Sequence, residues 1–214
     1  MPHAGASPHW EQSWSSGIPK GTAFDVGGPS ATLLTALATN KYSGKTALVP
    51  GAGRAYDALA IAAHGFERVV ACDLAPSACT AARTEISTSE FAKCVEVVQA
   101  DFFDEAELSG TYDLIWDCTF LCALDPSVRT RWAERTAALL KPDGALITCV
   151  FPIAPGKQGG PPYALDVPLV RSLLEPVGLR AVEVRDPLPS EEAHRPGALG
   201  ALGGPGTALA VWRR

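Results

Sequence analysis

An apolar stretch that breaks at two glycines and resumes with helical spacing constrains the fold more than any other feature. Residues 47–60 read ALVPGAGRAYDALA, so the apolar residues of a buried strand end at the turn Gly51-Ala52-Gly53. The apolar positions after that turn follow the period of a helix. A strand, a glycine turn and a helix in this order often bind a ligand at the turn. The candidates are a phosphate, a dinucleotide and a nucleoside of another kind.

The chain continues this alternation of strands and helices. A first helix is expected to begin at Pro29-Ser30, with Ser30 as its cap. The predicted strands are 45–49, 68–73, 94–99, 112–117 and 144–151, and the helices between them are 54–64, 75–91 and 127–140. Apolar strands that alternate with helices predict a parallel sheet covered on both faces.

The C-terminal part departs from that alternation. After a helix at 166–176, residues 179–186 and 207–213 are predicted strands with no crossover helix between them, which favours an antiparallel pair. We therefore predict one α/β domain over residues 1–214, with a mostly parallel seven-stranded sheet that ends in an antiparallel hairpin. Residues 1–29 are expected to form an irregular N-terminal arm with two tryptophans.

Charge and cysteine usage limit the partners. A formal net charge of -5 argues against nucleic acid, which is bound through clustered Lys and Arg, so the expected ligand is small. The sequence shows neither a signal peptide nor a run of apolar residues long enough to span a membrane. The six cysteines form no CxxC pair, so we expect free thiols, no bound metal and a cytoplasmic protein.

Three kinds of ligand compete for the glycine turn. A phosphate loop is disfavoured because the SGKT motif at 43–46 precedes its strand and has Thr39 where the first glycine would stand. A dinucleotide turn requires a third glycine where this chain has Tyr56. A nucleoside without phosphates needs close backbone approach only at Gly51 and Gly53. S-adenosylmethionine is such a ligand.

Two carboxylates follow later strands at the same predicted edge of the sheet. Asp73 closes the second strand, where a carboxylate can accept hydrogen bonds from both ribose hydroxyls, of S-adenosylmethionine or of a dinucleotide. Asp101 ends the third strand, where it can accept from the adenine amino group while Phe102 packs on the base. Together with the glycine turn, these residues predict a nucleoside site.

Three further segments carry a family resemblance. Residues 112–126 (YDLIWDCTFLCALDP), 139–153 (LLKPDGALITCVFPI) and 159–165 (GGPPYAL) resemble the thiopurine S-methyltransferase superfamily, especially its halide and thiol methyltransferase branch. The resemblance extends from Trp10 to about residue 185. It implies a class I methyltransferase with a Rossmann-like core over 30–214, S-adenosylmethionine as methyl donor and S-adenosylhomocysteine as product.

The resemblance also implies roles for individual residues. Cofactor contacts are implied for Trp10, Trp14 and Phe24 of an arm that closes over the site, for Gly51 and Gly53, for Asp73 and Leu74 at the ribose, for Asp101 and Phe102 at the adenine, and for Asp117, Thr119, Phe120 and Arg129. Tyr163 and Cys118 are implied at the acceptor. Three positions differ from the family pattern: Phe24 stands where tryptophan is usual, Ala55 replaces a third glycine, and Cys118 occupies a position that is often tyrosine.

The predicted reaction is in-line transfer of a methyl group to a thiol, hydrosulfide or halide ion. These nucleophiles make a general base optional, and we interpret His3, His9, His64 and His194 as structural or surface residues. One alternative is a thioether or another larger sulfur or selenium acceptor. Another is a cofactor-binding protein without turnover. An NAD-dependent oxidoreductase is disfavoured by Tyr56.

Overall fold

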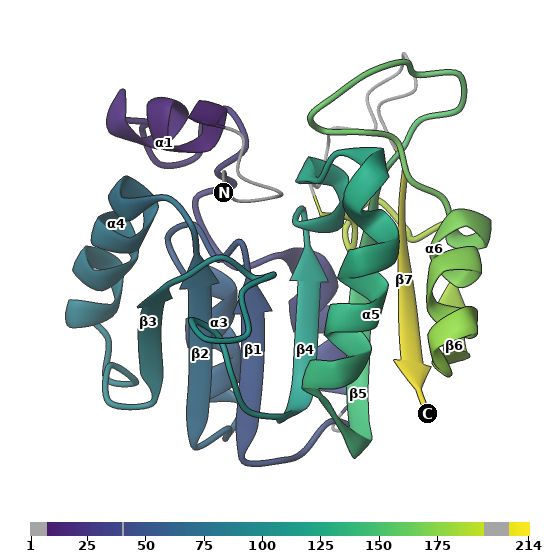
Figure 1. Ribbon diagram of the computed structural model, residues 1–214. Coiled ribbons are helices and arrows are strands. Elements are labelled where there is room, and N and C mark those ends of the chain that lie inside the picture. Colours follow the sequence, from purple (N-terminus) through teal and green to yellow (C-terminus); the bar gives the residue numbers. More distant parts are fainter. Residues whose placement is uncertain (1–7, 40, 195–205) are drawn as a thin grey trace.

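A seven-stranded sheet in the order β3-β2-β1-β4-β5-β7-β6 forms the centre of the molecule (Figure 1). The computed structural model describes residues 8–39, 41–194 and 206–214. The strands are β1 (Thr46–Pro50), β2 (Arg68–Asp73), β3 (Val95–Gln99), β4 (Tyr112–Cys118), β5 (Leu140–Ile153), β6 (Arg180–Arg185) and β7 (Gly206–Arg213). β7 runs antiparallel to both β5 and β6, and the other strand pairs are parallel. The predicted mostly parallel sheet with a terminal antiparallel hairpin is confirmed.

Helices cover both faces of the sheet. The α-helices are α1 (Pro8–Ser15), α2 (Ala31–Ala38), α3 (Tyr56–Ala63), α4 (Pro76–Ser87), α5 (Arg129–Leu139) and α6 (Val167–Leu174). Short 3-10 helices lie at Leu121–Ala123, Pro126–Val128 and Glu175–Val177. α5 and α6 pack on one face with the buried indoles of Trp132 and Trp212, whereas α2, α3 and α4 pack on the other with Trp116. The burial of apolar side chains on both faces is what a parallel sheet requires.

The predicted helices and strands are present, with two local corrections. Ser30 holds the N-cap position of α2, but its side chain does not cap the helix, because its hydroxyl lies 3.3 Å from His194 Nδ1. The arm is not wholly irregular, because it contains α1. Glu11 of α1 accepts hydrogen bonds from the backbone nitrogen (3.0 Å) and hydroxyl (2.6 Å) of Ser77, so the arm is anchored on the first turn of α4.

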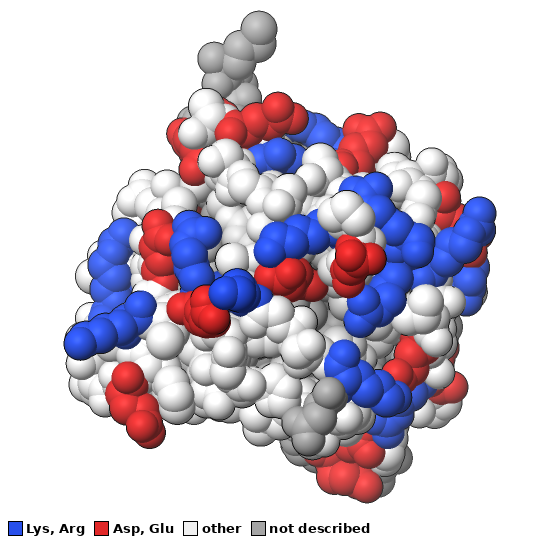
Figure 2. All heavy atoms as spheres, turned by 90° about the horizontal axis from the view of Figure 1, so that it is seen from below, with Lys and Arg blue, Asp and Glu red and all other residues white. Residues whose placement is uncertain are grey.

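The two ends of the parallel strands differ in character. The carboxyl ends lie at the edge of the sheet beside which Figure 1 shows α1. The opposite end carries interspersed acidic and basic side chains (Figure 2), including the ion pairs Arg68–Glu96 and Lys141–Asp113. None of the helices in the described residues has the length and apolar character needed to cross a bilayer.

Candidate active site

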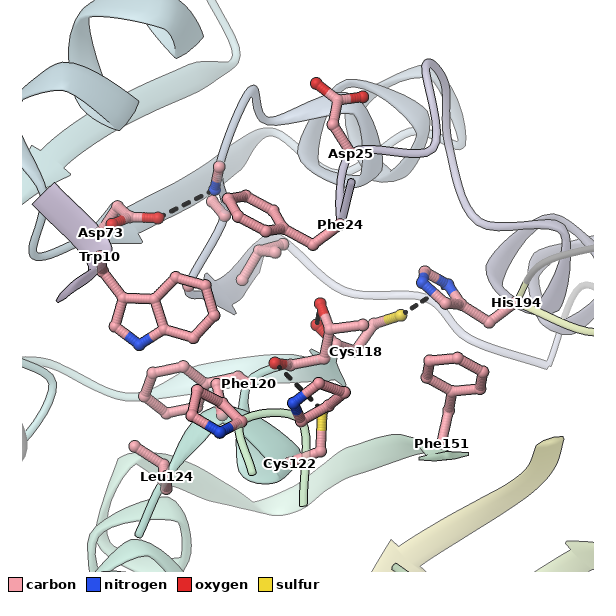
Figure 3. A pocket seen from close by; sticks show the side chains of 18 of the residues that line it. Trp10, Phe24, Asp25, Asp73, Cys118, Phe120, Cys122, Leu124, Phe151 and His194 are labelled. Atoms are coloured by element: carbon pink, nitrogen blue, oxygen red, sulfur yellow. Dashed lines mark hydrogen bonds between the residues drawn. The ribbon is translucent and has the colours of Figure 1, made fainter. Parts of the chain in front are cut away.

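A cavity of about 990 Å³ lies at the carboxyl ends of the strands (Figure 3). Its walls come from the arm, the turn after β1, the ends of β2, β3 and β4, and the segment that follows β5. The predicted site residues that line it are Trp10, Trp14, Phe24, Gly51, Gly53, Asp73, Leu74, Asp101, Phe102, Cys118, Thr119 and Phe120. Asp117, Arg129 and Tyr163 are not among the lining residues.

The glycine turn brings bare backbone to the cavity wall. Gly51 has a φ of +61°, and a Cβ at this position would lie 2.7 Å from Cδ2 of Phe120. Gly53 has a φ of +52°, and its Cβ would lie 3.1 Å from the ring of Trp14. Both residues therefore need a left-handed backbone and the absence of a side chain. Ala55 adopts the same left-handed conformation, with a φ of 63°, which explains why glycine is usual at this position.

Asp73 is held rigidly at the end of β2. Its carboxylate oxygens accept hydrogen bonds from the backbone nitrogens of Gly53 and Ala75, both at 3.0 Å. Burial raises the pKa of this carboxyl above its ordinary value, and the backbone hydrogen bonds oppose that shift. The same carboxylate thus fixes the glycine turn and faces the cavity, as a ribose-binding residue would.

The end of β3 supplies a second pair of lining residues. Asp101 is 6% exposed, and its Oδ1 accepts a hydrogen bond of 2.9 Å from the backbone nitrogen of Phe103. Phe102 packs edge-on against Phe120, with ring centroids 5.0 Å apart. A carboxylate beside a flat aromatic surface suits a purine with an exocyclic amino group.

The arm forms an aromatic side of the cavity. The ring of Phe24 packs edge-on against Trp10 and Trp14, with centroid separations of 5.3 and 5.4 Å. Behind these rings, Arg54 Nε donates to Asp25 Oδ2 at 2.6 Å, and Arg54 Nη2 donates to the carbonyl of Ile18 at 2.6 Å. The Asp25 side chain is only 2% exposed, so this ion pair ties the arm to the residue that follows the glycine turn.

Asp117 lies behind the cavity wall and fixes the turn that follows β4. Its carboxylate accepts hydrogen bonds from Trp132 Nε1 (2.9 Å) and from the backbone nitrogen of Leu121 (3.1 Å), which fixes the turn after β4. Complete burial raises the pKa of Asp117 from 3.8 to about 6, although these hydrogen bonds favour the charged form. The cofactor contact predicted for Asp117 stays a prediction, and the structure gives this residue a supporting position.

The raised pKa of Asp117 predicts a pH-dependent stability. Because the folded-state pKa lies above the ordinary value, the folded protein binds this proton more tightly than the unfolded chain. The stabilising contribution therefore grows as the pH falls from 7 towards 4 and is lost as the pH rises through 6. We expect the free energy of unfolding of the wild type to rise over this range by roughly 2–3 kcal/mol relative to Asp117→Asn. Urea titrations at each pH measure the difference, and parallel curves for the two proteins would contradict it.

Arg129 and Tyr163 form a separate contact beside the cavity. The guanidinium carbon of Arg129 lies 5.7 Å from the centroid of the Tyr163 ring, and burial lowers the pKa of Arg129. The backbone nitrogen of Tyr163 donates to the carbonyl of Cys122 at 2.7 Å. Hydrogen bonds from Ser127, and then one from Tyr163, lower the pKa of Asp125. Tyr163 makes these contacts outside the cavity lining, and the acceptor role predicted for it stays a prediction.

His194 lines the cavity and was not predicted as a site residue. Its Nδ1 lies 3.2 Å from Sγ of Cys118, and its ring centroid lies 4.9 Å from that of Phe151. His194, Cys118 and His9 all line the cavity, so two of the four histidines lie at the candidate site, and the interpretation of these histidines as structural or surface residues stays a prediction. Burial raises the pKa of the Cys118 thiol well above its usual range. The possible metal-ligating atoms of Cys118, Cys149 and His194 lie within 4.8 Å of one another; the expected absence of a metal stays a prediction.

Asp57 also lines the cavity and was not predicted as a site residue. This buried carboxylate accepts hydrogen bonds of 2.7 Å from the backbone nitrogen of Ser30 and from Trp116 Nε1. Burial raises the pKa of Asp57 above its usual range. The sequence signal for Asp57 is its position in the first turn of α3, the helix that directly follows the glycine turn.

The fold and the cavity define a class of protein. The glycine turn in the cavity wall, the fixed carboxylate of Asp73, and Asp101 beside Phe102 fit the uncharged ribose and adenine of S-adenosylmethionine at the carboxyl edge of the sheet. The glycopeptide N-methyltransferase MtfA, solved in complex with S-adenosylmethionine, has a similar fold: the TM-score is 0.67 at 16% identity, covering 92% of this chain and 99% of that one. The architecture is that of the class I S-adenosylmethionine-dependent methyltransferases.

Sequence comparison places the chain within that class. Residues 6–202 match the family model for thiopurine S-methyltransferase, and the chain belongs to this family of S-adenosylmethionine-dependent methyltransferases. It is 38% identical over 181 residues to the probable thiol methyltransferase 2 of Arabidopsis thaliana, covering 85% of this chain and 77% of that one. It is 37% identical over 178 residues to thiocyanate methyltransferase 1 of the same plant, covering 83% and 75%. The resemblance predicted from the sequence motifs is thereby confirmed.

Proposed function

We propose that the protein transfers a methyl group from S-adenosylmethionine to a small soft nucleophile: a thiol, hydrosulfide or halide ion. The observation that carries this proposal is the apolar and sulfur-containing wall of the cavity around Cys118. Cys122 and Phe151 lie about this part of the cavity, whereas Asp73 lies at its other side (Figure 3). Phe120 and Leu124 also line the cavity. Such a wall suits an acceptor that is small and polarisable.

The bound cofactor supplies a methyl group on a positively charged sulfur. The side chains of the protein would bind the cofactor and exclude water from it. Asp73 and the glycine turn would hold the nucleoside, while Trp10, Trp14 and Phe24 would shield it from water. Fixing acceptor and methyl in line can contribute about 7–11 kcal/mol to the lowering of the barrier. A dry, apolar site also favours a reaction in which a negative nucleophile and a positive sulfur lose their charges.

Two further observations support this assignment. The curated relatives are named for methylation of a thiol and of thiocyanate, which are both small sulfur nucleophiles. All six cysteines of the chain are free, and five of them are buried, which supports the proposal of a reducing, cytoplasmic location.

An acceptor screen tests the proposal. We expect the purified protein to release S-adenosylhomocysteine with at least one of iodide, bromide, hydrosulfide and small alkyl or aryl thiols, and to release little without an acceptor. Calorimetry with S-adenosylmethionine on the same sample establishes that the cofactor binds. Release with thioethers alone would indicate a larger acceptor. Cofactor binding without release for any acceptor would instead indicate a binding protein without turnover.

A further inference from the structure

Two thiols and an imidazole meet at the side of the cavity opposite Asp73. Their possible metal-ligating atoms, one each from Cys118, Cys149 and His194, lie within 4.8 Å of one another. Each of the three residues is at most 7% exposed. Figure 3 shows Asp73 at one side of the cavity and His194 at the other. Thiolate sulfur and imidazole nitrogen are the ligands that zinc and related thiophilic ions prefer.

The sheet itself brings the two thiols together. Cys118 is the last residue of β4 and Cys149 lies in β5, and the two are partners in the register of these parallel strands. Partners on neighbouring strands direct their side chains to the same face of the sheet. Both belong to the hydrophobic layer that α2, α3 and α4 cover. The position of the two thiols is therefore fixed by strand pairing and does not depend on a loop.

The imidazole of His194 is held beside these thiols. Its Nδ1 lies 3.2 Å from Cys118 Sγ, and its ring packs on Phe151 with ring centroids 4.9 Å apart. Phe151 lies two residues after Cys149 in β5 and belongs to the same hydrophobic layer. The strand β5 thus supplies one ligand and also the aromatic surface that orients the third.

The spacing of the three atoms suits a zinc-like ion. Zn–S bonds of about 2.3 Å and Zn–N bonds of about 2.0–2.1 Å place two ligand atoms of a tetrahedral site about 3.5–3.8 Å apart. The 3.2 Å between Nδ1 of His194 and Sγ of Cys118, and the limit of 4.8 Å for the whole set, lie on either side of this range. Small side-chain movements would therefore bring all three atoms to one ion.

Charge favours a divalent ion. Each thiol loses its proton to solvent as its sulfur binds the ion, and the imidazole binds in its neutral form. A divalent cation makes the set of two thiolates and one imidazole neutral. A monovalent ion such as Cu(I) would leave a net negative charge in the protein interior, near the carboxylate of Asp57, whose charge acts on the Cys118 thiol. An unbalanced charge in the interior is costly.

We propose that Cys118, Cys149 and His194 bind a divalent thiophilic cation of the zinc class. This site goes beyond methyl transfer and does not depend on it. Cys118 and His194 line the cavity, which gives the ion a path from solvent. Three protein ligands leave a fourth position, which a water molecule or another small ligand from the cavity can fill. The absence of a CxxC pair excludes only ligands that are close in sequence, whereas these come from β4, β5 and the segment after β6.

Cadmium is a suitable probe because its bonds to thiolates absorb in the ultraviolet. Titration of the reduced protein with CdCl2 is expected to give a charge-transfer band that saturates at one ion per chain. Cys118→Ser and Cys149→Ser should each lose at least about half of this absorbance, because each removes one of the two thiolate ligands. His194→Gln should keep the band and lower the affinity by at least about 10-fold, the smallest cost of losing even an outer-shell partner.

Cys72→Ser is the matched control for this titration. Cys72 is also buried and lines the cavity, but it lies in β2 beside Asp73, outside the cluster. Serine retains the hydrogen bond that Cys72 donates to the carbonyl of Ala100. This variant should therefore bind cadmium as the wild type does. A wild-type titration without a saturating band, or an unchanged band in Cys118→Ser and Cys149→Ser, would overturn the proposal.

Thermal unfolding tests the same site with zinc itself. An ion that binds only the folded state stabilises it, so ZnCl2 should raise the Tm of the wild type and of Cys72→Ser. The double variant Cys118→Ser/Cys149→Ser should unfold cooperatively with no such rise, and MgCl2, which prefers oxygen ligands, should raise none of them. His194→Gln, which leaves every thiol in place, gives the same comparison if the double variant does not fold. An equal rise with zinc in the variants that lack a ligand, or with magnesium in the wild type, would contradict the site.

Discussion

Asp73→Ala is expected to lower the affinity for S-adenosylmethionine by at least about 100-fold. A buried carboxylate that accepts from two ribose hydroxyls makes two charge-assisted hydrogen bonds, each contributing about 1.5–3 kcal/mol. The substitution also leaves the backbone nitrogens of Gly53 and Ala75 without their acceptor, so the glycine turn loses its fixed position. Isothermal titration calorimetry with S-adenosylmethionine measures the change, and Asp73→Asn, which retains an acceptor oxygen, should lose less affinity.

Asp113→Ala is the matched control for this measurement. Like Asp73, Asp113 accepts hydrogen bonds from two backbone nitrogens, those of Lys45 (3.0 Å) and Thr46 (2.9 Å). It lies, however, at the opposite end of the sheet. Its removal should lower the free energy of unfolding and leave the cofactor affinity close to that of the wild type. If Asp73→Ala bound S-adenosylmethionine as tightly as the wild type, the assignment of Asp73 to the ribose would be wrong.

Asp25→Ala is expected to release the arm from the body of the protein. The substitution leaves the guanidinium of Arg54, which is only 15% exposed, without its carboxylate, and breaking a buried ion pair in this way costs about 3–5 kcal/mol. Asp25 also accepts a hydrogen bond of 2.6 Å from the backbone nitrogen of Gly27, which is lost as well. We expect amide hydrogen exchange across residues 8–28 to accelerate by 100-fold or more, while exchange in the central strands is unchanged.

An exposed ion pair elsewhere in the protein provides the control for the hydrogen-exchange measurement on Asp25→Ala. Glu67→Ala removes the partner of Lys45, a pair whose side chains are 67% and 76% exposed, and surface pairs of this kind contribute about 0–1 kcal/mol. Exchange in the arm should therefore match that of the wild type. Unchanged exchange across residues 8–28 in Asp25→Ala would show that aromatic packing alone holds the arm in place.

Local sequence signals were sufficient to predict the strands of the sheet and the residues on one side of the cavity. Each central strand is a short apolar run bounded by turn residues, and each loop at its carboxyl end follows directly in the chain. The positions of Gly51, Asp73 and Asp101 could therefore be predicted from the parallel order of the strands alone. These residues share one edge of the sheet because the strands that precede them run in the same direction.

The acceptor side could not be predicted in this way. His194 meets Cys118 across 76 residues of sequence, and it does so from a segment with no regular periodicity. The path of the loop that carries Tyr163 is likewise set by tertiary contacts, such as the bond of its backbone nitrogen to Cys122. Long-range contacts of this kind depend on how irregular segments pack, and hydrophobic periodicity carries no information about that packing.

The placement of the five tryptophans gives the protein an intrinsic optical reporter. Trp116, Trp132 and Trp212 are fully buried in the two hydrophobic layers, so their fluorescence is insulated from small molecules in solution. Trp10 and Trp14 line the cavity, where an entering purine can quench their emission. A fall in indole fluorescence on ligand addition would therefore originate in the arm, and its time course would follow occupancy of the site without any added dye.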